Sequence, residues 1–284
     1  MVNVTIGGVP EHFNLPWHLA LNKGKFMEHG IDLRWKDFPG GTGAMCKALR
    51  EETIDMSVIL TEGIIKDIID GNLSKIIQTY VQTPLNWGVH VAVNAPYKHI
   101  DDLKEKKAAI SRYGSGSHLM AFINAQNNHW DIDNDLDFKV VKNLEGAIVG
   151  LSNGKVDYFL WEKFTTKPLV DNGIFRNIGN CPSPWPCFVI AARTEFLKNE
   201  KKTIKTILEV INTTTSKFKN IPDIDTTIAE RYKLQLKDVQ EWLSITEWSQ
   251  SIIDKETIKD TQKQLFSLNI IPDMVSYNTL THKV

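Results

Sequence analysis

The chain has 284 residues, 42% hydrophobic and 24% charged, which is ordinary for a soluble globular protein. This length exceeds what one hydrophobic core usually organises, so we expect two domains. Lysine and arginine (33) balance aspartate and glutamate (34), and the formal net charge of -1 argues against nucleic acid as a partner. No stretch approaches the roughly 18 consecutive apolar residues of a membrane span, so membrane insertion is not expected.

The amino terminus enters an alternating strand pattern, VNVTIGG, with no charged and then apolar leader before it. Three cysteines, an odd number, favour a reducing compartment. We therefore expect a cytoplasmic protein, or a periplasmic one whose export signal has been removed. The sequence leaves open whether the chain is truncated, which oligomer it forms and whether a transporter is its partner.

Strand and helix patterns alternate along the first part of the chain. Strands are predicted at residues 2–8, 31–38 and 54–60. Helices are predicted at residues 15–30, 41–52 and 63–71. This βαβαβ order is typical of an open α/β sheet.

Apolar runs at residues 75–81 and 87–93 lead into a second series of the same kind. Its strands are predicted at residues 106–111, 137–142 and 156–162, and its helices at residues 119–127 and 144–154. The segment GAMCKALREETID resembles GAIVGLSNGKVD, because in both a Gly-Ala pair opens a helix and an aspartate, Asp55 or Asp157, opens the next strand. Both strands also end in a glutamate, Glu62 or Glu162. We interpret the two series as a duplication.

Helical patterns dominate the rest of the chain, at residues 195–218, 226–244 and 255–269. Their apolar residues recur at helical spacing, which indicates a packing stripe. We expect this tail to return and cover the first lobe.

Three segments in order, IGGVPEHFNLPWHLALNKGKFMEHGIDLRW, PGGTGAMCKALREETIDMSVILTEG and DDLKEKKAAISRYGSGSH, resemble the solute-binding proteins of ABC transporters for nitrate, sulfonate and taurine. Those proteins share a fold with the thiamine-pyrimidine biosynthesis proteins. The resemblance implies an α/β fold of the type II periplasmic-binding-protein class, with two lobes, two crossing strands as a hinge and a helical C-terminal tail. It implies that residues 1–90 plus 192–284 form lobe one and residues 91–191 form lobe two. The crossings are expected near residues 89–93 and 188–192.

Ligands of open α/β sheets bind at the carboxyl ends of the strands, where loops lead into helices. Applied to the predicted strands, this rule selects candidates in both lobes, and Trp87 joins them as a flat wall for a ring, as do Trp161 and Trp185. The candidate ligand-binding residues are Glu11, His12, Phe13, Gly41, Thr42, Thr61, Glu62, Trp87, Arg112, Ser115, Ser117, His118, Trp161 and Glu162.

Two of these loops are glycine-rich helix starts, Gly41-Thr42-Gly43 in one lobe and Ser115-Gly116-Ser117 in the other. A helix N-terminus presents unpaired N–H groups and the positive end of a dipole, so each could hold a carboxylate, sulfonate or phosphate. Arg112 is the expected charge partner. Thr42 and Ser117 are also expected to cap their helices, each worth about 1 kcal/mol of helix stability.

Glu62 and Glu162 are harder to explain beside an anion, and three interpretations stay open. The carboxylates could contact amino or ring N–H donors of the ligand, could be neutralised by Arg112, His12 or Lys163, or could be structural ion-pair partners.

The expected function is closure around a small organic, partly anionic ligand in a cleft between the lobes, without chemistry, cofactor, metal or catalytic residues. The sequence contains no HExxH motif and no pair of CxxC motifs, and Ser115 with His118 lacks a third, orienting group. The alternative is a cytosolic enzyme of pyrimidine-precursor biosynthesis in the thiamine pathway, related by fold. The cysteine-rich CCCxC-type signature of that family is missing, since the region after the strand at residues 54–60 reads LTEGIIKD.

Overall fold

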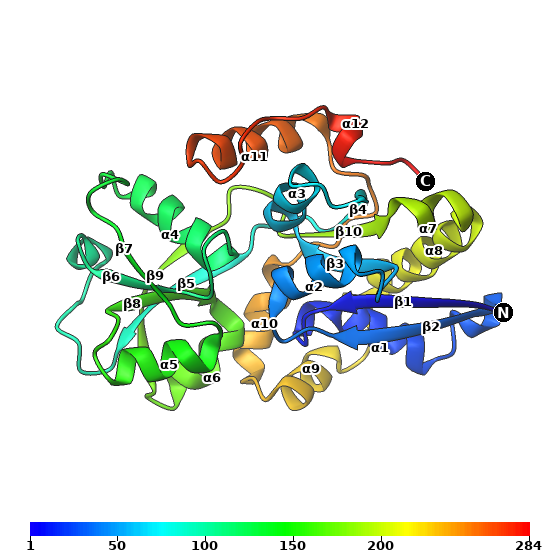
Figure 1. The fold of residues 1–284 in the computed structure, drawn as a ribbon. Coiled ribbons are helices and arrows are strands. Elements are labelled where there is room, and N and C mark those ends of the chain that lie inside the picture. Colours follow the sequence, from blue (N-terminus) through cyan, green and yellow to red (C-terminus); the bar gives the residue numbers. More distant parts are fainter. The chain divides into compact units, whose positions relative to one another are not determined.

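The computed structural model describes residues 1–284 and divides the chain into two compact units. The first unit combines Met1–Thr83 with Trp185–Val284, and the second unit consists of Pro84–Pro184. The chain therefore leaves the first unit once and returns to it once, as the colours of Figure 1 show.

The first unit is built on a five-stranded sheet in the order β2-β1-β3-β10-β4. Strands β1, β2 and β3 are parallel, because a helix carries the chain back after each of them, and β10 runs antiparallel between β3 and β4. The bounds are β1 (Val2–Gly8), β2 (Ile31–Asp37), β3 (Met56–Leu60), β4 (Ser74–Val81) and β10 (Phe188–Arg193). The central strand β3 is fully buried from Met56 to Ile59, so the core of the unit lies around it.

Nine α-helices belong to the first unit. They are α1 (Leu15–Asn22), α2 (Gly41–Arg50), α3 (Thr61–Ile69), α7 (Thr194–Asn199), α8 (Lys201–Lys217), α9 (Ile224–Tyr232), α10 (Leu236–Ile245), α11 (Lys255–Ser267) and α12 (Tyr277–Leu280). The C-terminal helices α11 and α12 pack against α3 (Figure 1). The prediction that the tail covers the first unit is therefore confirmed.

The second unit repeats this plan with a sheet in the order β7-β6-β8-β5-β9. Its parallel strands are β6, β7 and β8, and β5 runs antiparallel between β8 and β9. The bounds are β5 (Asn86–Ala92), β6 (Lys107–Ile110), β7 (Asp137–Val140), β8 (Tyr158–Glu162), β9 (Phe175–Pro182), α4 (Gly116–Asn127), α5 (Leu144–Ser152) and α6 (Lys163–Asp171).

The two aspartates of the sequence repeat make the same contacts in the two units. Asp55 donates its amide to the Thr5 carbonyl over 2.8 Å, and its Oδ2 accepts the Thr5 amide over 2.9 Å. Asp157 and Lys107 form the same two bonds, again at 2.8 and 2.9 Å. Each aspartate thus ties the strand that it precedes to the neighbouring parallel strand, β1 in the first unit and β6 in the second. The structure confirms that the two units are built alike.

The boundaries between the units differ from the predicted ones. The chain divides between residues 83 and 84 and between residues 184 and 185, ahead of the predicted positions at 90 and 191. The two predicted crossing strands are β5 and β10, and each is hydrogen-bonded on both edges within a single sheet. Such pairing holds a strand inside one unit, so the connections lie before β5 and before β10.

Three predicted helices are shorter in the structure. The helix expected at residues 15–30 ends at Asn22, before Gly24 adopts a left-handed φ of +66°. The helix expected at residues 226–244 is two helices, α9 and α10, separated where Lys233 adopts φ +55°. Residues 195–218 form α7 and α8 with a break at Glu200. The helical spacing of apolar residues continues across these breaks, because the segments on both sides pack on the same unit. The sequence pattern therefore predicted longer helices.

Candidate functional site

The candidate residues lie where parallel strands end and helices begin. In the first unit these are the carboxyl ends of β1, β2 and β3, followed by α1, α2 and α3. In the second unit the corresponding places follow β6 and β8. Loops at this edge of a parallel sheet are the usual ligand-binding positions of open α/β folds.

The loop after β1 forms a 3₁₀ turn, η1 (His12–Asn14), whose side chains are buried. The His12 ring stacks on Phe13 at a centroid distance of 4.7 Å and meets the Trp242 ring edge-on at 4.4 Å. Burial lowers the pKa of His12 to about 3, so the ring is neutral at pH 7. Glu11 is half-buried at the start of the turn. His12 therefore supplies no positive charge to neutralise a carboxylate.

The start of α2 has backbone donors that the protein does not use. Its N-cap is Gly40, which has no side chain, and the Gly41 amide bonds back to the Phe38 carbonyl over 2.9 Å. The amides of Thr42 and Gly43 have no acceptor in the protein. The predicted capping role of Thr42 is wrong, because Thr42 lies inside the first turn of the helix.

The Thr42 side chain packs against the start of α3 instead. A Cβ atom added at Gly63 would lie 2.3 Å from Thr42 Cγ2, so a glycine is needed there for the two helix starts to approach. Thr61 ties α3 to the segment before β10, because its hydroxyl donates to the Pro186 carbonyl over 2.5 Å and its amide to Cys187 over 3.1 Å. The polar groups of Thr61 thus bond within the protein.

Glu62 follows Thr61 in the first turn of α3 and is 5% exposed. The indole Nε1 of Trp185 donates to Glu62 Oε2 over 2.9 Å. Burial raises the pKa of Glu62 to about 7, although its backbone and indole hydrogen bonds lower it in part. Glu62 is therefore neither an ion-pair partner nor a permanently charged group.

In the second unit, the segment SRYGSGSH forms the turn from β6 into α4. Ser115 is the N-cap of α4, and its hydroxyl accepts the His118 amide over 3.3 Å. The Ser117 hydroxyl accepts the Ser111 amide over 3.0 Å and lies 3.0 Å from the Ser115 hydroxyl. Ser117 therefore closes the turn and does not cap the helix as predicted. The amides of Gly116 and Ser117 have no acceptor in the protein.

His118 supports this turn from inside. Its Nδ1 accepts the Gly114 amide over 3.1 Å, and its ring packs edge-on against Phe122 and Phe138. Burial lowers the pKa of His118 to about 4. Arg112, by contrast, is exposed.

Glu162 caps α6, although it stands at the same place in the sequence repeat as Glu62. Its two carboxylate oxygens accept the amides of Phe164 over 3.1 Å and Thr165 over 2.6 Å. Trp87 lies opposite Glu162 in the pairing of β5 with β8. Trp161 instead packs against the apolar core of the second unit. Burial raises the pKa of Glu162, and its hydrogen bonds and the charge of Lys163 lower it in part. Of the interpretations left open for Glu162, a structural role as a helix cap has direct support.

Within the first unit the structure brings together the starts of α2 and α3, so Gly41, Thr42, Thr61 and Glu62 form one group. Within the second unit Ser115, Ser117 and His118 form one group, and Trp87 with Glu162 another. Trp161 does not join them. Ligand contact by the predicted residues stays a prediction.

Trp185 and Trp242 are residues whose contacts the sequence did not predict. Trp185 bonds Glu62 from the segment that re-enters the first unit, and Trp242 of α10 packs on His12. His12 Nε2 and Trp242 Nε1 are both buried without a hydrogen-bond partner. The tryptophan-rich segment EWLSITEW could have drawn attention to α10, but no local pattern says which loop it covers.

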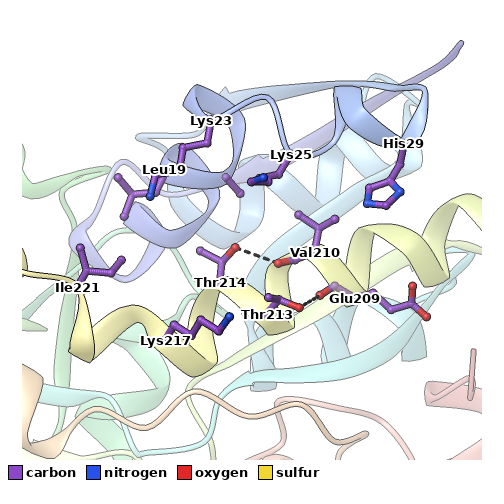
Figure 2. Close-up of a pocket in the computed structure, with 11 residues that line it drawn as sticks. Leu19, Lys23, Lys25, His29, Glu209, Val210, Thr213, Thr214, Lys217 and Ile221 are labelled. Atoms are coloured by element: carbon purple, nitrogen blue, oxygen red, sulfur yellow. Dashed lines mark hydrogen bonds between the residues drawn. The ribbon is translucent and has the colours of Figure 1, made fainter.

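A separate groove of about 480 Å³ lies between α1 and α8 (Figure 2). Its lining includes Lys23, Lys25 and Lys217, and the hydroxyls of Thr213 and Thr214 in its wall donate to carbonyls of α8 over 2.8 and 2.9 Å. Helix α1 starts near the carboxyl end of β1 and runs in the opposite direction to that strand. Its last turn therefore lies near the amino ends of the parallel strands. The groove is therefore distinct from the candidate site.

No group of three or more His, Cys, Asp or Glu side chains is arranged to hold a metal ion. None of the helices combines the length and the apolar composition that crossing a membrane requires.

Two sheets of the same mixed order, with the chain passing from the first unit to the second and back, define a type II periplasmic-binding-protein fold. The predicted fold class is therefore confirmed. The sequence profile of the Ca3427-like PBP family, in which PBP stands for periplasmic binding protein, matches residues 87–181. No curated protein matches the sequence.

Solved structures share the fold along the whole chain. The CA3427 gene product of Candida albicans, described as defining a new family with the generic periplasmic binding protein fold, has a TM-score of 0.91 and 24% identity, covering 100% of this chain and 97% of that one. The alkanesulfonate-binding protein SsuA from Xanthomonas axonopodis pv. citri, bound to MOPS, has a TM-score of 0.83 and 15% identity, covering 100% and 99%. The aliphatic sulphonate binding protein SsuA from Escherichia coli has a TM-score of 0.77 and 16% identity, covering 100% and 92%.

Proposed function

We propose that the chain binds a small organic oxyanion with donors from both units and performs no chemistry on it. The observation that carries this proposal is the pair of helix starts at α2 and α4. Each has two backbone amides without an acceptor in the protein, at Thr42 and Gly43 and at Gly116 and Ser117. The amides and the helix dipole at such a terminus favour an anion.

The fold supports the same ligand class. A relative of this fold is described as an alkanesulfonate-binding protein and carries MOPS, which is itself a sulfonate. We further propose that binding closes the two units on the ligand.

Isothermal titration calorimetry with ethanesulfonate and nitrate, and with tetramethylammonium as a cationic control, tests the proposal. We expect saturable binding of an oxyanion and no heat from tetramethylammonium. Absence of binding by every oxyanion tried at pH 5.5 contradicts the proposal.

The variant Gly116→Pro tests the role of α4. Residue 116 is the first position of the helix and follows an extended Ser115 (φ -83°, ψ 166°), a geometry that proline accepts, so the change removes one amide donor without breaking the helix. A hydrogen bond to a charged group is worth about 1.5–3 kcal/mol, so affinity should fall about 10- to 100-fold.

Lys255→Pro is the matched control. Lys255 is the first residue of α11, and its N-cap Asp254 has the same extended geometry (φ -76°, ψ 164°). This variant should bind like the wild type. Equal affinity of the Gly116→Pro variant and the control contradicts the role of α4.

We also propose a cytoplasmic location, because the chain has three cysteines, an odd number, which favours a reducing compartment. Fractionation of the host cells tests this, and recovery with periplasmic proteins contradicts it.

A further inference from the structure

Glu62 is a buried carboxyl group at the start of α3 whose side-chain donor is the indole of Trp185. Its neighbour Gly63 contacts Thr42. Glu62 therefore stands in the helix turn that contacts the start of α2, where unused backbone amides favour an anion. An anionic ligand and an anionic side chain at one place need an explanation, because like charges in a buried site repel strongly.

No cation offsets the carboxyl of Glu62. The causes of its shifted pKa are burial and hydrogen bonds, with no neighbouring charge among them. Titratable groups on α2 and before β10 include the buried thiols Cys46 and Cys187. On α3, Lys66 pairs with Asp70, and Asp67 pairs with Arg50 of α2.

The charged groups on the other elements packed against α3 are also engaged elsewhere or exposed. Arg193 at the end of β10 pairs with Asp55, and Lys75 at the start of β4 donates to the carbonyls of α12. The exposed charged residues are Lys47 and Glu51 of α2 and Lys255, Glu256, Lys259, Asp260 and Lys263 of α11.

A protonated carboxyl group resolves the conflict. The Trp185 N–H needs an acceptor, so Glu62 Oε2 takes that bond and the proton is carried by Oε1. We propose that Glu62 is an uncharged carboxylic acid that donates a hydrogen bond from Oε1 to an oxygen of the bound oxyanion. This inference rests on the proposed function and adds a specificity-determining residue to it.

The pKa of Glu62 agrees with this role. Burial raises it from 4.5 to about 7, so the acid is present at and below neutral pH and is lost above it. Only the acid donates a hydrogen bond, and the carboxylate repels the ligand. Affinity for an oxyanion must therefore fall as the pH rises through 7.

The test measures the affinity for ethanesulfonate, which stays a monoanion at every pH used, by calorimetry from pH 5.5 to 8.5. With a pKa of about 7, we expect the wild-type affinity to fall about 30-fold over this range. Glu62→Gln has an amide that donates at every pH and an oxygen for Trp185, so its affinity should change less than 3-fold. Glu256→Gln, which removes an exposed acid in the first turn of α11, should follow the wild type.

Proton uptake on binding gives a second measurement, which would show no change if Glu62 had a purely structural role. At pH 8, binding to the wild type should take up about one proton per ligand, seen as heats that vary with the ionisation enthalpy of the buffer. Binding to Glu62→Gln should take up none.

The outcomes separate the two proposals. Wild-type binding that is independent of pH, or that strengthens as the pH rises, overturns the role of Glu62 and leaves the binding of oxyanions intact. The same pH dependence in Glu62→Gln as in the wild type also overturns it. No binding by either protein at pH 5.5 overturns both proposals.

Discussion

Trp185 and Glu62 are 123 positions apart in the sequence, yet the indole N–H of Trp185 donates to Glu62 Oε2 over 2.9 Å. Trp185 is the first residue of the segment that returns to the first unit. Thr61, next to Glu62, donates to the Pro186 carbonyl of the same segment over 2.5 Å. Two adjacent hydrogen bonds thus tie the start of α3 to the returning chain.

Glu62→Gln should change how stability depends on pH, even without a ligand. The folded-state pKa of Glu62, about 7, lies above its ordinary value of 4.5, so its contribution is complete below pH 4.5 and is lost as the pH rises through 7. This shift corresponds to about 3 kcal/mol in total. In urea unfolding, the stability of Glu62→Gln relative to the wild type should rise by about 3 kcal/mol between pH 4.5 and 8.5. A constant difference would mean that Glu62 titrates normally.

Trp185→Phe should raise the pH at which the stability contribution of Glu62 is lost. The indole hydrogen bond favours the carboxylate form, so its loss raises the pKa of Glu62 further. The smaller ring should also lower stability at every pH by about 1–3 kcal/mol, because Trp185 is 4% exposed. Urea unfolding over the same pH range measures both effects. Trp130→Phe, which changes a similarly buried tryptophan of the second unit, should lower stability without moving the transition.

Glu162→Ala should destabilise α6. The side chain accepts two amides of the first turn, at 3.1 and 2.6 Å, and loss of a helix cap costs about 0.5–2 kcal/mol. Glu162→Gln keeps one acceptor oxygen, so about half of this loss should remain. Thermal and urea unfolding measure the two changes. Glu145→Ala, an exposed acid in the first turn of α5, is the control and should change stability by less than about 0.5 kcal/mol.

His90→Phe should make the protein more resistant to acid. Burial lowers the pKa of His90 to about 3 from 6.5, so its contribution to stability is complete above pH 6.5 and is lost as the pH falls towards 3. At pH 5 this loss amounts to about 2 kcal/mol. Phenylalanine does not titrate and fits beside Phe159 and Phe175, whose rings lie 5.0 and 4.8 Å from His90.

The measurement is the free energy of unfolding at pH 7 and pH 5. The Thr166 hydroxyl, which contacts His90 Nε2, also donates to the Glu162 carbonyl over 2.9 Å, so it keeps a partner in the variant. The drop between the two pH values should be about 2 kcal/mol smaller in His90→Phe than in the wild type. An equal drop in both proteins would show that His90 is protonated without penalty.

The order of strands and helices, the open α/β sheets and the likeness of the two units could be predicted from local patterns, whereas the two-lobe fold class was implied by the resemblance to solute-binding proteins. Alternation of apolar residues marks strands and helices, and the repeated Asp55 and Asp157 mark the same hydrogen bonds in both sheets. The glycine-rich starts of α2 and α4 were also visible in the sequence. These features depend on neighbours in the chain, which a sequence displays directly.

The boundaries between the units and the helix caps were predicted less well. Strands β5 and β10 were expected to cross between lobes, but pairing on both edges keeps each in one sheet. Thr42 and Ser117 were expected as caps, but Gly40 and Ser115 hold those positions. A shift of one or two residues in where a helix begins decides such a role, and the pattern of residue types does not fix it.

The sequence by itself predicted a glutamate in each unit where a strand is followed by a helix. Only the tertiary structure decided what the two glutamates do. Glu162 is the N-cap of α6, so its oxygens turn to the amides of the first turn, whereas Glu62 is the second residue of α3 and faces the distant Trp185. Burial raises the pKa of both carboxyl groups, that of Glu62 to about 7. The different roles of Glu62 and Glu162 thus come from solvation and long-range contacts. Both depend on residues far away in the chain, so the local sequence does not reveal them.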